Sequence, residues 1–121
     1  MATTTMSPRE HRQVALDFLT ASDEEFERGD VLQGAEKLWG AAAHAVMAAA
    51  QQREWPHESH RSLKNATMNL SEEAEDPLID AYFLAAEKFH RHFYHDSMED
   101  WERDADRPKV HDFVQRVLAL S

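Results

Sequence analysis

Residues 31–52, VLQGAEKLWGAAAHAVMAAAQQ, form the segment that most restricts how this chain can fold. At about 100° per residue, its apolar side chains cover more than half of a helix circumference. A line of small residues along one edge lets a neighbouring backbone approach closely: Gly34, Ala41, Ala45 and Ala48. A helix of this kind is not expected on a surface, because it would expose too many apolar side chains to water. The segment therefore predicts a helix that is central to the fold or shared with a second subunit.

Helix start and stop signals surround this segment. Ser7, Pro8 and Glu10 have the spacing of an N-cap, a first-turn proline and a capping-box acid. Gly29 supplies a left-handed stop, and Asp30 follows as the cap of the segment described above. These signals predict a first helix that ends near Gly29 and a second helix that runs to about residue 53.

Four further helical stretches follow. Pro56 breaks the pattern before a helix expected over His57 to Leu70, and Asp76 with Pro77 opens the next one. The core face expected for that fourth helix is Leu78, Tyr82, Ala85, Phe89 and Phe93. A short helical turn around Trp101 and a last amphipathic helix over residues 107–120 complete the pattern.

The predicted fold class is all-α. No segment alternates with the period of a strand, and the chain has only three glycines with which to build hairpin turns. Short connections favour antiparallel neighbours, so we expect an up-and-down antiparallel bundle of four main helices plus short C-terminal helices. Its 121 residues suit a single domain, which we place at residues 7–121 after a flexible tail at residues 1–6.

Charge and composition exclude several classes of function. The net charge of -10, from 23 acidic and 13 basic side chains, disfavours non-specific nucleic-acid binding, which depends on Lys and Arg. The absence of cysteine removes disulfides, thiol nucleophiles and thiolate zinc sites. No secretory signal and no membrane span are recognisable, so we expect a cytoplasmic protein without a membrane partner.

The stretch EKFHRHFYHD, residues 87–96, is the densest in chemically capable side chains. On a helix, Arg91 and His95 share one polar face because they lie one turn apart. His90 and His92 point in two other directions, so the three histidines of this stretch cannot form one metal shell by themselves.

Metal binding by other combinations is disfavoured as well. A di-iron bundle would need two Glu-x-x-His pairs on facing helices. Glu87 with His90 is one such pair, but the other, Glu54 with His57, is interrupted by a proline. His57 and His60 would need a third ligand from elsewhere. We therefore predict no metal and no cofactor, and a metal bound through His57, His60 or His90 is the weakest alternative.

Two motifs resemble the PaREP family of small helical prokaryotic proteins, over roughly residues 14–120. Its members carry an A-E-K-x-W-G-A-A helix followed by an L-H-x-N-F-Y-E segment. The matching residues of this chain are, in the first motif, Ala35, Glu36, Lys37, Trp39, Gly40, Ala41 and Ala42, and in the second Phe89, His90, Phe93 and Tyr94. Arg91 and His92 depart from the usual second motif, as does His95, where an acid is common.

This family is similar to the larger HEPN group of helical domains. The resemblance implies a homodimer, a protein partner such as a nucleotidyltransferase, or an RNA-cutting activity. HEPN nucleases carry an arginine and a histidine separated by four to six residues, whereas Arg91 and His95 are separated by three. In a metal-independent ribonuclease, His95 would act as general acid or base and Arg91 would stabilise the charge on phosphorus.

The alternative for the same motifs is packing. Glu36 and Lys37 would then receive His90 and Tyr94, Arg91 would pair with Glu87, and Trp39 would contact Phe89 and Phe93, with Gly40 admitting a bulky neighbour. We prefer this interpretation. The sequence thus predicts a homodimeric HEPN-like binding or regulatory module without catalysis of its own, and the alternative is a ribonuclease that uses Arg91 and His95.

Overall fold

A computed structural model describes residues 5–121, and this part of the chain consists of helices and their connections. The five helices are α1 (Pro8–Glu27), α2 (Val31–Gln52), α3 (His60–Ala74), α4 (Pro77–His95) and α5 (Asp100–Leu118). The all-α prediction is confirmed. The flexible tail predicted for residues 1–6 falls mainly on residues 1–4, which lie outside the described residues.

Three of the predicted helix starts are confirmed. The Ser7 hydroxyl accepts a hydrogen bond from the Glu10 amide, and the Glu10 side chain accepts one from the Ser7 amide, which completes the capping box. Asp30 and Asp76 cap α2 and α4 through their carboxylates. Each cap satisfies backbone N–H groups that have no partner inside the helix.

α3 begins at His60 rather than at the predicted His57. Ser59 takes the N-cap position and forms a reciprocal pair with Ser62, so the helix starts at the first residue that has a capping side chain before it. Residues 53–59 instead form the α2–α3 connection, which includes Pro56.

α5 is one continuous helix of 19 residues, where the sequence predicted a short turn and a separate last helix. Pro108 lies inside it. A proline inside a helix removes one backbone hydrogen bond, in this case to the carbonyl of Asp104. Both residues are exposed, so water can satisfy that carbonyl and the helix continues.

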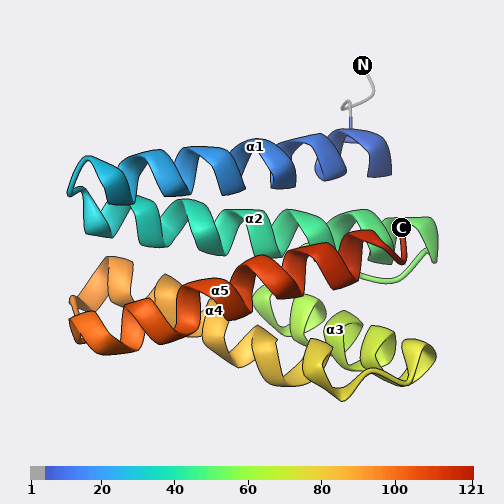
Figure 1. The fold of residues 1–121 in the computed structure, drawn as a ribbon. Helices are drawn as coiled ribbons and strands as arrows, with labels where there is room; N and C mark the ends of the chain where they lie inside the picture. Colours follow the sequence, from blue (N-terminus) through green and yellow to red (C-terminus); the bar gives the residue numbers. More distant parts are fainter. Residues whose placement is uncertain (1–4) are drawn as a thin grey trace.

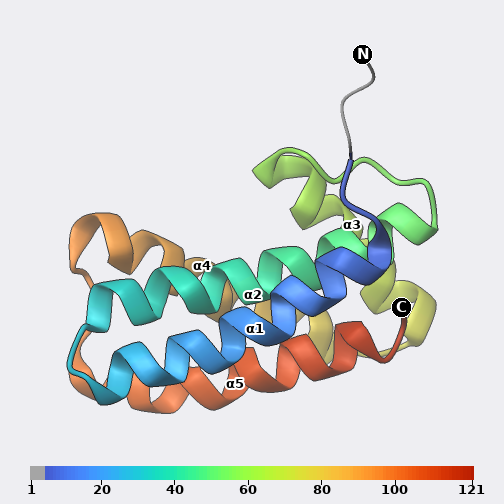
Figure 2. The ribbon, with the colours of Figure 1, turned by 90° about the horizontal axis from the view of Figure 1, so that it is seen from above.

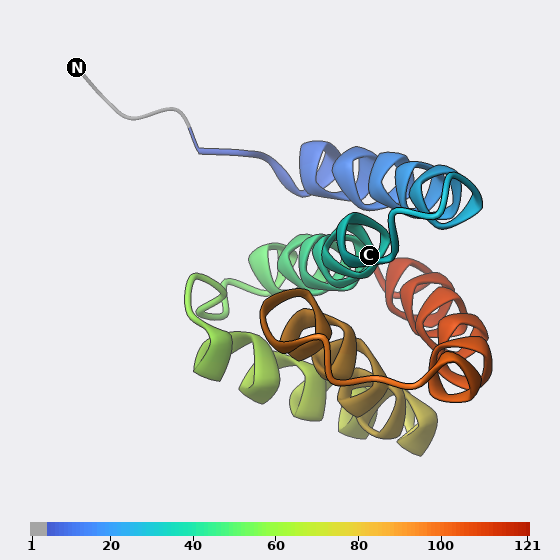
Figure 3. The same cartoon turned by 90° about the vertical axis from the view of Figure 1, so that its left-hand side faces the viewer.

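The helices pack around α2. Figure 1 shows α1 and α2 running antiparallel along the length of the molecule, with α5 running obliquely below α1 and in front of α4. The end view in Figure 3 places α2 between α1 on one side and α3 and α4 on the other, with α5 closing the flank. Figure 2 shows the same arrangement from above, with α5 alongside the α1–α2 pair. None of the described helices is long and apolar enough to cross a membrane.

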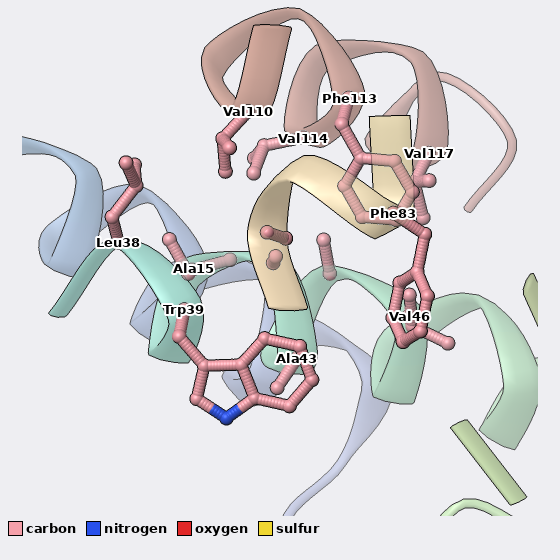
Figure 4. Close-up of a cluster of buried hydrophobic side chains, with 14 of the residues drawn as sticks. Ala15, Leu38, Trp39, Ala43, Val46, Phe83, Val110, Phe113, Val114 and Val117 are labelled. Atoms are coloured by element: carbon pink, nitrogen blue, oxygen red, sulfur yellow. The ribbon is translucent and has the colours of Figure 1, made fainter. Parts of the chain in front are cut away.

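The core confirms that α2 is central rather than half-exposed. Twelve of its 22 residues are buried, and eight of these are alanines. Valines and Phe113 from α5 and Phe83 from α4 fill the space on its far side (Figure 4). A single chain therefore covers α2, and the apolar circumference of this helix leaves no large face for a second subunit.

The buried face of α4 includes Ala85 and Phe89, as predicted, but elsewhere it is shifted from the predicted face. Leu78 was expected in the core but is 37% exposed, whereas its neighbour Ile79 is buried. Phe83 and His92 are buried as well, and Phe93 is only partly buried. The shift follows from three helices contacting α4, which bury a wider sector than a single stripe.

Two glycines set the distance between α1 and α2. A Cβ atom on Gly34 would lie 2.9 Å from the ring of Phe26, and one on Gly40 would lie 3.0 Å from the ring of Phe18. The Ser22 hydroxyl donates a buried hydrogen bond of 2.7 Å to the Gly34 carbonyl in the same contact. The two glycines therefore let the rings of Phe26 and Phe18 pack directly against the backbone of α2.

We expect Gly34→Ala to lower the free energy of unfolding by about 1–3 kcal/mol, because the new methyl group overpacks against Phe26. In a Phe26→Ala background the clash is absent, and the same substitution should stabilise the protein by up to about 1 kcal/mol through helix propensity. Urea denaturation of the four variants measures both effects. An equal effect of Gly34→Ala in the two backgrounds would contradict the packing argument.

Candidate functional site: a histidine and carboxylate cluster around Trp39

Arg91 and His95 lie on the outward face of α4. Both side chains are exposed, together with Leu84. The two flanks of this face contact different helices: Glu87 reaches His60 of α3, and Lys88 reaches Asp106 of α5. The predicted nuclease pair therefore occupies a solvent-facing strip between α3 and α5.

The expected pairing of Arg91 with Glu87 is wrong. Glu87 is buried and its Oε2 atom lies 2.6 Å from His60 Nε2, so its carboxylate points toward α3. Within residues 5–121, neither Arg91 nor His95 makes a side-chain hydrogen bond or an ion pair. The positive charge of Arg91 is thus not neutralised by its nearest acid.

Trp39 is the centre of the polar cluster formed by the motif residues. The rings of His60 and His90 stack on it, with centroids at 5.3 Å and 4.9 Å and interplanar angles of 16° and 27°. The two histidine rings are only 6.2 Å apart, which is too short for them to sandwich the indole. Both therefore lie on the same side of Trp39, and helices α2, α3 and α4 each contribute to the cluster.

Each of these histidines is held by a carboxylate. His60 contacts Glu87 at 2.6 Å, and His90 Nδ1 lies 3.3 Å from both carboxylate oxygens of Glu36. Burial raises the pKa of Glu36 above its usual value, and the neighbouring His90 opposes that shift only in part. In both pairs one ring nitrogen is bound by a carboxylate, so the orientation of the imidazole is fixed.

The packing contacts expected for the motif are present in part. Glu36 does receive His90, and Phe18 occupies the space that Gly40 leaves. Lys37 instead pairs with Glu25 at 3.4 Å. The aromatic neighbours of Trp39 are His60, His90 and Phe83 rather than the expected Phe89 and Phe93.

Tyr94 extends the cluster toward solvent. Its ring meets the rings of His90 and Phe93 edge-on, and 65% of the residue is exposed. His60 is the member of the cluster that sequence reasoning did not connect to Trp39. Its partner Glu87 lies 27 residues away in the sequence, and no local pattern joins the two positions.

The histidines that were considered as metal ligands separate into two places. His60 and His90 meet at Trp39, whereas His57 lies in the α2–α3 connection, where its Nδ1 atom is 2.9 Å from the Trp55 carbonyl oxygen. Among the described residues, no group of three or more histidine, aspartate or glutamate side chains has an arrangement that could hold a metal ion.

The fold and the cluster define a small all-α bundle in which the motif residues Glu36 and His90 pair across the contact between α2 and α4. Residues 10–114 match the Archaeal PaREP1/PaREP8 family, and the chain belongs to that family. No curated protein and no solved structure gives a significant match.

A double-mutant cycle can test which partner Glu87 has. We expect the substitutions His60→Ala and Glu87→Gln to be coupled by about 0.5–3 kcal/mol, because the first removes the imidazole and the second removes the carboxylate of the same contact. Arg91→Ala and Glu87→Gln should be additive, since those side chains do not meet. Free energies of unfolding from urea titration at constant pH give both coupling values, and the opposite pattern would place Glu87 with Arg91.

Proposed function

We propose that this chain is a homodimeric binding module that acts without catalysis of its own, as a HEPN-like partner of another cytoplasmic protein such as a nucleotidyltransferase. The observation that carries the proposal is the contrast between the Trp39 cluster and the outward face of α4. The motif residues around Trp39 are paired inside the chain, whereas α4 presents large apolar side chains to solvent, with Leu84 57% exposed and Tyr94 65% exposed.

The proposed dimer contact is the outward face of α4 rather than α2. Leu84 lies on this face with Arg91 and His95, and Tyr94 is adjacent to them. An isologous contact repeats the same residues across a two-fold axis. Packing α4 against its copy would bury Leu84 and Tyr94 of both chains without disturbing the bundle.

Leu84→Glu should convert the dimer into a monomer, because it places a charge in the apolar centre of the proposed contact. Leu32→Glu is the matched control, since Leu32 is an exposed leucine of α2. Light scattering after size exclusion measures the mass of each variant. A monomeric wild type, or a dimer that survives Leu84→Glu, would contradict the α4 contact.

The second candidate is a metal-independent ribonuclease that uses Arg91 and His95 across this dimer. The observation in its favour is the binding of Glu87 to His60, which leaves Arg91 available to a phosphate. In such a dimer the two exposed pairs would approach each other from both chains. The net charge of -10 opposes general attraction of RNA, so this activity would depend on specific contacts.

Incubation with a mixed pool of structured and single-stranded RNA in excess chelator distinguishes the two functions. The binding-module proposal expects intact RNA with the wild type. Cleavage by the wild type that is lost in both His95→Ala and Arg91→Ala, but kept in Arg9→Ala, would overturn it in favour of the nuclease. Arg9 is an exposed arginine of α1 and serves as the control for loss of charge.

A further inference from the structure

A second group of histidines lies where α2 faces α1, apart from the Trp39 cluster. His11 of α1 is buried, and its Nδ1 atom lies 2.9 Å from Nδ1 of His44 on α2. The ring of His57, from the α2–α3 connection, approaches His11 edge-on with centroids 6.2 Å apart. The ring of Phe18 also lies next to that of His44, with centroids 5.8 Å apart.

The contact between His11 and His44 depends on a single proton. In a hydrogen bond between two imidazoles, one Nδ1 atom donates and the other accepts. When both rings are protonated, neither Nδ1 atom has a lone pair to accept with. The hydrogen bond is then lost, and two like charges remain at contact distance between α1 and α2.

The groups around this pair do not compensate for a second charge. Glu10 is the acid that acts on His11, but it is exposed and its carboxylate already accepts the Ser7 amide. His57 adds repulsion when it is charged, and Glu54 and Glu58 on its own connection are exposed to solvent. From α5, the nearby group is the Leu118 carbonyl, which accepts a hydrogen bond from Arg12.

The two ends of α1 are held in different ways. Its C-terminal half packs on Gly34 through Phe26, and Asp23 pairs with both Arg107 and His111 of α5. Its N-terminal half contacts α2 through the histidine pair and the buried Ala15, and it contacts α5 through Arg12, which donates to the Leu118 carbonyl. Just before the helix, the Met6 carbonyl accepts a hydrogen bond from Gln51. Loss of the histidine contact would therefore loosen the N-terminal half first.

We propose that His11, His44 and His57 form a pH-sensitive latch, which holds the N-terminal half of α1 on α2 and releases it on acidification. Release would uncover the stretch of α2 around His44 that α1 otherwise covers. The latch does not involve the outward face of α4. This proposal is therefore independent of whether the chain forms a dimer or cuts RNA.

The direction of the pH dependence follows from burial. Burial lowers the pKa of His11, and the neighbouring His57 lowers it further; burial and His11 together lower the pKa of His44. Both start from an ordinary value of 6.5, so the folded state favours their neutral forms. The latch is intact above about pH 6.5 and weakens as the pH falls through the lowered pKa values.

Hydrogen exchange read by mass spectrometry, in chelator between pH 7.5 and 5, tests the latch on the full chain. Each proton taken up on release should lower the protection factors of residues 8–17 by about tenfold per pH unit, as the pH falls from about 6.5 to the lowered pKa values of the folded state. Protection in α4 and α5 should stay constant. His11→Gln and His44→Gln each remove one of the two charges, so each should about halve the pH dependence of residues 8–17, and the double variant should abolish it.

The control is His111→Gln, which alters a histidine that pairs with Asp23 near the other end of α1 and should keep the wild-type pH dependence. Equal loss of protection in all helices, or the same pH dependence in wild type and both latch variants, would overturn the proposal. So would an increase in α1 protection when Zn²⁺ replaces the chelator at pH 7.5, since the cluster would then be a metal site.

Discussion

The packing of α2 among the other four helices is the constraint on which the rest of this structure depends. Its alanines and glycines let side chains of the neighbouring helices pack closely against it, and Leu38, Trp39 and Val46 are the larger side chains that it buries itself. The few polar residues of α2 can then reach only the seams between neighbouring helices. Glu36 emerges at the seam with α4 and His44 at the seam with α1, so the positions of both polar clusters follow from the packing of one helix.

The parts of the fold that the sequence predicted are those fixed by local chemistry. The caps at Ser7, Asp30 and Asp76 depend on residues two or three positions away, and all three are found where they were expected. Pro108 shows the limit of such rules. Whether a proline ends a helix depends on the solvent exposure of the carbonyl that it leaves free, which the surrounding fold decides.

The candidate site could be predicted only where one helix face determines it. Both Glu36 and His90 lie at the edge of an apolar stripe, so their contact was accessible from helical periodicity. The stacking of His60 on Trp39 was not, because it depends on where α3 begins and on how that helix packs against α4. The error at Leu78 has the same origin, since α4 carries apolar side chains on its buried face and on its outward face, and periodicity cannot rank the two.

The two histidine clusters differ in their partners. At Trp39 each imidazole faces a carboxylate, and the two groups form a complementary pair. Between α1 and α2 the imidazoles face each other, so a second proton breaks the contact that holds them. The same type of side chain therefore joins α2 to α3 and α4 at one cluster and makes its contact with α1 sensitive to pH at the other.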